Sequence, residues 1–186
     1  MVEHKYEIIL SGVGGQGLIT SGSILGQAAV VHENMNASLT SSYGVETRGT
    51  FTKADVIISK DEIYYPEVLK ADVILTLASV AYNKYASTLN KDTILIYDSN
   101  LISEVKGSDG KQYGYPITEL AIELGSEKIT NIIAIGIIVR KTRVLKKESV
   151  IKVLKDKFSG KEKIQKLNIL AFEKGFEMAN KCEVIK

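Results

Sequence analysis

A glycine-rich stretch near the start of the chain, Gly12-Val13-Gly14-Gly15-Gln16-Gly17, has a spacing that can support chemistry. It follows a short apolar run, precedes a helical pattern and satisfies G-x-G-x-x-G, the pattern of dinucleotide-binding loops. Glycines here permit positive φ and close approach of the backbone to a ligand, and the N–H groups that begin the next helix can bind an anion. The stretch predicts either an anion site or only a tight turn between strand and helix.

A nicotinamide dinucleotide would need one more feature, an acidic residue about 20 positions further on, at the end of the second strand. That strand ends in the polar sequence Ser41-Ser42-Tyr43-Gly44, and Glu33 lies too early, at the end of the first helix. The residues therefore argue against NAD. A stand-alone dinucleotide-binding oxidoreductase or sensor remains the alternative from another class.

A second polar cluster, Ser41 to Thr50, places Glu46 and Arg48 between two glycines in a loop after a strand. Open α/β sheets bind ligands at the carboxyl ends of their strands, so this loop is a candidate site. Arg48 can bind a carboxylate or phosphate through two hydrogen bonds. A local ion pair between Glu46 and Arg48 that stiffens the loop is an equally good interpretation.

A third cluster contains two adjacent tyrosines, Tyr64 and Tyr65, before Pro66. Tyrosines are enriched at protein interfaces because the ring is buried while the hydroxyl keeps a partner. Packing on the chain's own domain is the simpler interpretation for one of the two rings. Asp98, at the end of another strand, could bind a ligand or cap the following turn.

Several functions are disfavoured by what the sequence lacks. Cys182 is the single cysteine, so the chain can form no internal disulfide and cannot supply the thiolates of an iron–sulfur cluster. His4 and His32 have no metal-ligand spacing, and we expect neither a metal site nor catalytic residues in this chain. The net charge is +2, with the basic residues concentrated after Val139 on what we interpret as solvated helical faces. We expect a cytoplasmic protein without a nucleic-acid or membrane partner.

The elements that must position these residues alternate between short β-branched runs and helical patterns, which is typical of a parallel α/β sheet. We predict one α/β domain over residues 1–186: a mostly parallel, Rossmann-like open sheet flanked by helices, with amphipathic C-terminal helices. The expected strands are Tyr6–Ser11, Ala37–Thr40, Thr52–Ser59, Val73–Leu77 and Thr93–Asp98. The expected helices are one after the glycine loop with Leu18, Gly22, Leu25, Ala29 and His32 on one face, a short one at Pro66, and Ser79–Leu89, Lys147–Phe158 and Lys161–Lys181.

Two segments are harder to assign. Ser99–Gln112 is polar, contains Gly107 and Gly110, and predicts an exposed loop. Asn131–Val139 is apolar on every side, so its pattern fits a buried strand or a buried helix equally well.

Three segments together resemble one family: GVGGQGLITSGSILGQAA, SYGVETRGTFTKADVIIS and DEIYYPEVLKADVIL. They are similar to the gamma subunit of 2-oxoacid:ferredoxin (acceptor) oxidoreductases, and SYG-x-E-x-RG followed by YPEV looks most like the 2-oxoglutarate branch. The resemblance covers most of the chain and favours a helix for Asn131–Val139.

The resemblance implies an assembly. Such complexes convert a 2-oxoacid to an acyl-CoA, here 2-oxoglutarate to succinyl-CoA, and pass electrons to ferredoxin or another acceptor. It places thiamine diphosphate, magnesium and the iron–sulfur clusters in the alpha, beta and probable delta subunits, and an isolated chain would be inactive. A subunit acting on pyruvate, a branched-chain oxoacid or indolepyruvate is the alternative within the family.

The same resemblance assigns roles to the three clusters. Coenzyme A is the natural anionic ligand, and its expected contacts are Gly12, Gly14, Gly15, Gln16, Gly17 and Arg48. Interface roles fall to Tyr43, Glu46, Tyr64 and Tyr65.

Overall fold

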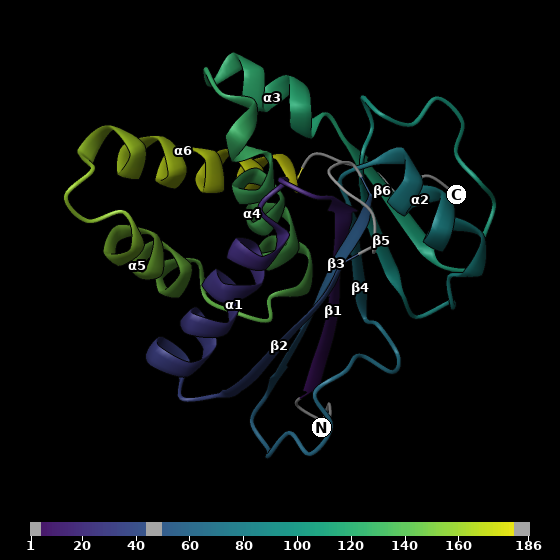
Figure 1. Cartoon of the computed structure of the whole chain (residues 1–186), viewed down its shortest axis with the longest axis horizontal. Coiled ribbons are helices and arrows are strands. Elements are labelled where there is room, and N and C mark those ends of the chain that lie inside the picture. Colours follow the sequence, from purple (N-terminus) through teal and green to yellow (C-terminus); the bar gives the residue numbers. More distant parts are fainter. Residues whose placement is uncertain (1–4, 44–49, 181–186) are drawn as a thin grey trace.

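The computed structural model describes residues 5–43 and 50–180, which form one six-stranded sheet with helices on both faces (Figure 1). The strands are β1 (Lys5–Val13), β2 (Asn36–Tyr43), β3 (Phe51–Ser59), β4 (Val73–Thr76), β5 (Ile94–Asp98) and β6 (Lys111–Tyr115). The helices are α1 (Leu18–Glu33), α2 (Ser79–Tyr85), α3 (Ile117–Glu123), α4 (Thr130–Thr142), α5 (Lys147–Lys157) and α6 (Glu162–Met178). Two short 3-10 helices, η1 (Ala86–Thr88) and η2 (Glu127–Ile129), complete the order.

The strand order is β2-β3-β1-β4-β5-β6, and β3 alone runs against the others. After β1 the chain continues through α1 and forms the edge strand β2. The later strand β3 lies between β1 and β2 in the sheet. The predicted fold class, a mostly parallel Rossmann-like sheet, is confirmed. Because β1 and β3 are antiparallel neighbours, the end of β1 lies beside the beginning of β3, with Gly12 opposite Thr52.

The two faces of the sheet carry cores of different size. One core packs α1, α4, α5 and α6 against the sheet through side chains such as Ile8, Leu10 and Val56, which alternate along their strands. The other core is smaller and packs α2 against the middle of the sheet through Ile9, Ile74 and other residues. The larger core holds the helices that position the glycine loop.

The segment Asn131–Val139 lies inside α4, and every one of its residues is buried. Gly136 of α4 and Gly175 of α6 let these two helices approach so closely that a Cβ on either would overlap the other helix's backbone. A helix enclosed by its neighbours has no polar face, which is why its sequence shows no 3.6-residue periodicity. The helix favoured by the resemblance is the observed structure.

Two local predictions were wrong. Pro66 begins no helix, and residues 60–72 instead form an irregular loop. Lys111 and Gln112, assigned to the exposed loop, begin β6, and Gln112 is buried. On α1, Leu18, Gly22, Leu25 and Ala29 are buried, and His32 at the end of the helix is partly buried.

Candidate anion-binding site

The glycine loop turns the chain sharply between β1 and α1. Gly15 and Gly17 adopt φ of 95° and 71°, a region that favours glycine, and Gly17 is the N-cap of α1. The first helical hydrogen bond runs from the Ser21 N–H to the Gly17 carbonyl (2.9 Å). The N–H groups of the first turn of α1 are therefore left without intrahelical partners, which is the arrangement that binds anions.

Gln16 holds this loop closed with both ends of its side-chain amide. Its Oε1 accepts a hydrogen bond from the Val13 N–H (2.8 Å), and its Nε2 donates to the carbonyl of Leu77, just after β4 (2.6 Å). A Cβ at Gly12 would overlap the Gln16 amide. The Gln16 amide thus packs against Gly12 and joins the loop to the end of β4 by a hydrogen bond.

Asn131, at the start of α4, supports the other side of the loop. It is buried, and its Nδ2 donates to the Gly17 carbonyl (3.2 Å) and to Ser21 Oγ (3.1 Å). A Cβ at Gly17 would lie 2.7 Å from that Nδ2, so glycine is required there for space as well as for φ. The sequence interpretation missed Asn131, although a lone amide at the start of an otherwise apolar run was the available signal.

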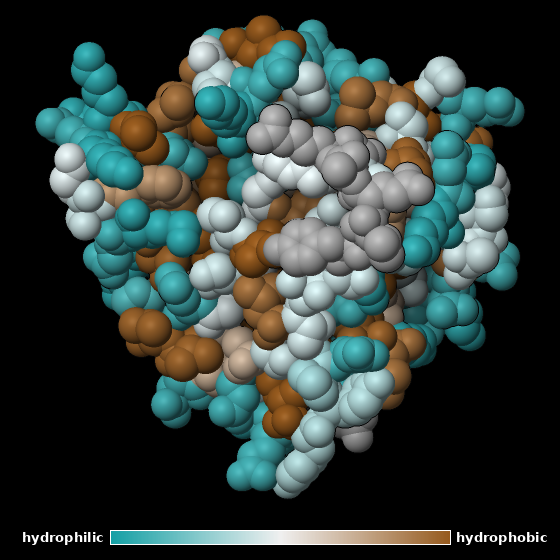
Figure 2. Space-filling view, in the orientation of Figure 1, coloured by the Kyte–Doolittle hydropathy of each residue, from teal (hydrophilic) through white to brown (hydrophobic). Residues whose placement is uncertain are grey.

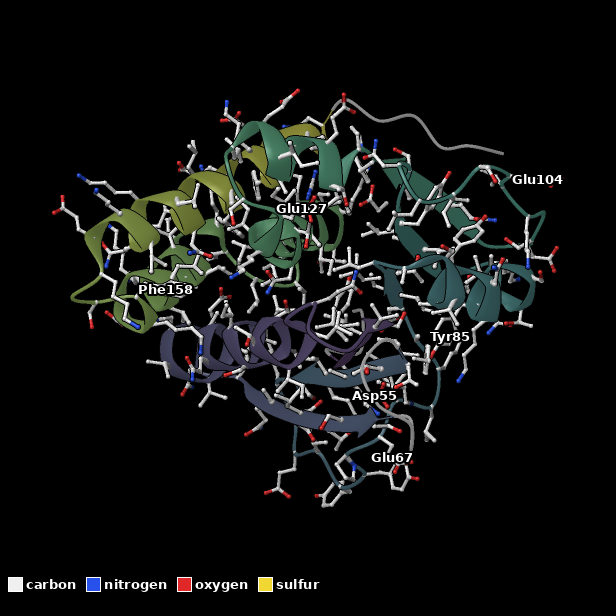
Figure 3. The ribbon with its side chains drawn as sticks, turned by 45° about the horizontal axis from the view of Figure 1, so that its top comes forward. Asp55, Glu67, Tyr85, Glu104, Glu127 and Phe158 are labelled. Carbon is white, nitrogen blue, oxygen red and sulfur yellow. The ribbon has the colours of Figure 1, made fainter. Side chains whose placement is uncertain are left out.

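Two adjacent pockets open beside the loop. One, of about 280 Å³, is lined by residues 13–20 and Thr52. The other, of about 350 Å³, shares Gly15, Gly17 and Thr20 and is otherwise mostly apolar, with the exposed Lys128 at its rim. Figure 3 labels Glu127 in η2 and Phe158 at the end of α5, both on the opposite side of α1 from β2 and β3. The cleft therefore combines free backbone N–H groups with an apolar compartment.

The segment with Glu46 and Arg48 cannot be placed, because residues 44–49 lie outside the described residues. Its flanks are placed. Tyr43 ends β2 opposite Thr52, and the Thr50 carbonyl accepts a hydrogen bond from the Gly14 N–H (3.3 Å). The segment thus leaves and rejoins the sheet at the end that carries the glycine loop.

Tyr64 and Tyr65 lie at the other end of the sheet, in the 60–72 loop. Tyr64 is 89% exposed and Tyr65 49% exposed, and the Tyr65 hydroxyl donates to Glu67 Oε2 (3.0 Å). That hydrogen bond raises the pKa of Tyr65. Figure 3 shows Glu67 on the side of β2 and β3 that faces away from α1. The predicted interface residues are therefore divided between two ends of the molecule.

The 60–72 loop is fixed by a buried carboxylate. Glu7 Oε2 accepts hydrogen bonds from the N–H groups of Leu69 and Lys70 (both 2.8 Å), and its Oε1 pairs with Lys5 Nζ (2.5 Å). Burial raises the pKa of Glu7, but the hydrogen bonds from Lys5, Lys70 and Leu69 outweigh it and the net shift is downward. These bonds hold Leu69 and Lys70 where a helix after Pro66 was expected.

Two further carboxylates, those of Asp98 and Asp55, make hydrogen bonds or ion pairs with other residues of the chain. Asp98 accepts from the Asn100 N–H (3.1 Å) and from both the N–H (3.0 Å) and the hydroxyl of Thr118, so it caps the turn and the start of α3. Asp55, buried in β3 and missed from the sequence, pairs with Lys53 Nζ (2.7 Å). Burial, followed by the charge of Asp55, raises the pKa of Tyr85 to about 12.

No group of three or more potential metal ligands occurs among residues 5–43 and 50–180. Within the same residues no helix is both long enough and apolar enough to cross a membrane.

The fold and the glycine loop define a class of α/β subunits. Comparison with known proteins identifies this class. The family model of pyruvate ferredoxin/flavodoxin oxidoreductase matches residues 7–178. The chain is 38% identical over 181 residues to a 2-oxoglutarate synthase subunit KorC of Methanocaldococcus jannaschii, an alignment that covers 96% of each chain. A crystal structure of the keto/oxoacid ferredoxin oxidoreductase gamma subunit from Geobacter sulfurreducens superposes with a TM-score of 0.84 at 33% identity, covering 95% of this chain and 97% of that one.

A third relative shows the same domain inside a longer protein. The ketoisovalerate oxidoreductase subunit VorA of Methanothermobacter thermautotrophicus is 31% identical over 94% of this chain, but the match spans only 36% of VorA. The chain belongs to the pyruvate ferredoxin/flavodoxin oxidoreductase family. Within it, the chain is a gamma subunit of a multi-subunit 2-oxoacid:ferredoxin oxidoreductase and is most similar to the 2-oxoglutarate branch, as its motifs predicted.

Proposed function

We propose that this chain is the gamma subunit of a 2-oxoglutarate:ferredoxin oxidoreductase and helps to bind coenzyme A. The reaction joins 2-oxoglutarate and coenzyme A, releases carbon dioxide, succinyl-CoA and the thiol proton of coenzyme A, and transfers two electrons, one to each of two ferredoxins. The observation that supports this assignment is the end-to-end similarity to a 2-oxoglutarate synthase subunit at 38% identity. Pyruvate, branched-chain oxoacids and indolepyruvate are the alternative substrates.

The chemistry of the oxoacid belongs to the partner subunits. With one cysteine the chain cannot supply the thiolates of an iron–sulfur cluster. The resemblance to the family further assigns the clusters, the thiamine diphosphate and its magnesium to the alpha, beta and delta subunits. The isolated chain is then inactive, and ferredoxin interacts with the complex rather than with this subunit alone.

The cleft beside the glycine loop has the features that coenzyme A requires. Its phosphates would bind the free N–H groups at the start of α1, with Arg48 as a second anion contact. The apolar compartment that shares Gly15, Gly17 and Thr20 is suited to a less polar part of the ligand. A nicotinamide dinucleotide fits less well, because Glu33 lies at the far end of α1 and its Oε1 accepts a hydrogen bond from the Lys146 N–H (2.6 Å).

Gly15→Ala, compared with Gly160→Ala, tests the coenzyme A role. Both glycines have positive φ (95° and 76°), and a Cβ at either would meet no atom within 4 Å, so the two substitutions carry similar backbone strain. Gly160 lies in the turn between α5 and α6 and lines neither pocket of the cleft. In the assembled complex with 2-oxoglutarate in excess, we expect Gly15→Ala to raise the KM for coenzyme A about tenfold, equivalent to roughly 1.4 kcal/mol, and Gly160→Ala to leave it unchanged.

Two further measurements complete the test. Arg48→Ala is expected to raise the same KM. Arg48→Lys, which keeps the charge, is expected to raise it less. If Gly15→Ala and Arg48→Ala both leave the KM and the turnover unchanged, the coenzyme A role is wrong. A complex that oxidises pyruvate or a branched-chain oxoacid in preference to 2-oxoglutarate would show that the substrate assignment is wrong.

A further inference from the structure

The edge strand β2 is the longest unprotected strand edge of the described chain. Its sequence, Asn36-Ala-Ser-Leu-Thr-Ser-Ser-Tyr43, contains no charged residue and no proline. The strand pairs with β3 without interruption from end to end, so it contains no bulge. Natural edge strands are normally blunted by a charge, a proline, a bulge or short length, because their backbone groups otherwise attract another strand.

The direction of each backbone group in β2 follows from the ladder of β3. The hydrogen bond from the Gly14 N–H to the Thr50 carbonyl shows that the even-numbered residues of β3 face β1. The odd-numbered residues of β3 therefore face β2, where they pair with its even-numbered residues. The N–H and C=O groups of Ala37, Leu39 and Ser41 consequently point away from the sheet, and none of them has a partner among the described residues.

The opposite edge of the sheet is different. β6 has five residues, begins with Lys111 and is followed directly by Pro116. Lysine and proline are two of the standard means of discouraging edge pairing. The contrast marks the edge of β2 as the one available to another strand.

A pocket of about 430 Å³ lies at the beginning of β2, and polar and apolar groups line it in similar measure: Val30 of α1, Asn36, Ala37 and Ser38 of β2, and Glu62, Ile63 and Tyr64 of the 60–72 loop. Val30 is 52% exposed, and the adjacent Val31 is 67% exposed. Figure 2 shows hydrophobic surface over this end of α1, in the lower left of the view. A strand added to β2 would place a side chain directly beside this pocket.

We propose that β2 receives an extended segment of another subunit of the oxidoreductase, which adds a strand to the sheet and inserts a side chain into the pocket beside Val30 and Tyr64. Backbone hydrogen bonds to Ala37, Leu39 and Ser41 hold the segment, and a basic side chain at its end pairs with Glu62. This inference rests on the proposed function, because the partner is another subunit of that same complex.

Two observations favour a partner subunit over a second copy of this chain. β2 begins at the end of the sheet that carries the exposed Tyr64, a predicted interface residue, so a strand along β2 would extend the same surface. The same domain occupies about a third of VorA, where it is covalently joined to other parts of an oxidoreductase.

Amide hydrogen exchange of the full chain, alone and in complex with its co-expressed alpha and beta subunits, tests the proposal residue by residue. The inward N–H groups of Ser38 and Thr40 already bond to β3 and serve as internal controls. The outward N–H groups of Leu39 and Ser41 are expected to exchange fast in the free chain and at least about tenfold more slowly in the complex. Unchanged exchange at Leu39 and Ser41 in a stable complex would overturn the inference while leaving the proposed function intact.

Ser41→Pro, with Ser41→Ala as its matched control, tests the same contact by assembly. Proline removes an outward N–H and leaves the β2–β3 ladder in place, whereas alanine removes only the exposed hydroxyl. We expect Ser41→Pro to weaken association with the partner subunits about fivefold and Ser41→Ala to have no effect. Far-ultraviolet circular dichroism of each variant checks that the fold is kept.

Two other outcomes are distinguishable. A free chain that is already dimeric, with Leu39 and Ser41 protected, would identify a second copy as the occupant and overturn the inference. A wild-type chain that binds no alpha or beta subunit would contradict the proposed function itself.

Discussion

The two ends of the sheet hold their loops by different chemistry. At the end of β1 the neutral amides of Gln16 and Asn131 fix the glycine loop, and the N–H groups that begin α1 remain open. At the beginning of β1 the carboxylate of Glu7 fixes the 60–72 loop by accepting its N–H groups. A carboxylate beside the glycine loop would compete with an anionic ligand for those N–H groups, whereas an amide supports the loop without adding charge.

The largest expected change in stability is at the beginning of β1, where the Glu7 carboxylate fixes the 60–72 loop. Glu7→Ala removes the acceptor of two backbone N–H groups and leaves Lys5 without its partner, so we expect the free energy of unfolding to fall by roughly 2–4 kcal/mol. Urea unfolding at pH 7 measures this, with Glu123→Ala on the exposed surface of α3 as the control. A loss no larger than that of the control would mean that water replaces the carboxylate.

At the end of β1, where the amides of Gln16 and Asn131 fix the glycine loop, we expect a smaller loss of stability and a larger loss of coenzyme A binding. Gln16→Ala removes the acceptor for Val13 and the donor for Leu77, which should lower the free energy of unfolding by about 1–3 kcal/mol. It also frees the loop, so the KM for coenzyme A in the assembled complex should rise. Glu7→Ala should leave that KM unchanged in complexes that assemble, because Glu7 lies seven residues from Gly14, about 23 Å along β1.

Gln16→Glu makes the comparison more specific. This substitution keeps the size and the acceptor for Val13, loses the donor to the Leu77 carbonyl as Gln16→Ala also does, and places a carboxylate near the open N–H groups. If neutral support matters, Gln16→Glu should impair coenzyme A binding more than Gln16→Ala does, although it retains more of the side chain. The reverse order would indicate that the side chain serves only to close the loop.

The two ends also differ in how far the sequence alone predicts them. The glycine loop was predicted because positive φ and a strand-to-helix turn leave a local signature, which Gly15 and Gly17 confirm. The partners of that loop, Leu77 and Asn131, are 61 and 114 residues away in the two hydrogen bonds that join them to it, so no local pattern could reveal them. The 60–72 loop was mispredicted for the same reason, because the helix signal of Pro66 was local and its competitor, Glu7, was not.

The same distinction explains the elements that were correct and those that were missed. Most strand boundaries were close, since β-branched runs such as that of β3 carry their own signal. β6 has the sequence Lys-Gln-Tyr-Gly-Tyr, without a β-branched residue, and is a strand because β5 offers it a ladder. The reversed direction of β3 was also invisible, since pairing direction depends on which neighbour a strand finds.

The smallest expected effect is a difference in pH dependence between the two ends. The hydrogen bonds from Lys5, Lys70 and Leu69 hold the pKa of Glu7 below its usual value despite burial, so its stabilisation is present above the unfolded-state pKa and is lost as the pH falls through the folded-state pKa. The pKa of Asp72 shifts in the opposite direction, because burial raises it even though Asp72 Oδ2 accepts a hydrogen bond from the Glu7 N–H (2.8 Å). Through Asp72, a lower pH therefore stabilises the folded state of the chain. The two effects partly cancel, which keeps the net change small.

Protection factors measured by hydrogen exchange separate the two contributions. Between pH 6 and the range below about pH 4.5, the protection of the Leu69 and Lys70 amides should decrease, while that of the Val13 amide, bonded to Gln16, should stay constant. Asp72→Asn removes the opposing term and should make the decrease steeper, whereas Glu7→Gln should abolish it. Equal acid sensitivity of Val13 and Leu69 would show that the whole domain opens as one unit and that the chemistry of the two ends does not control their loops separately.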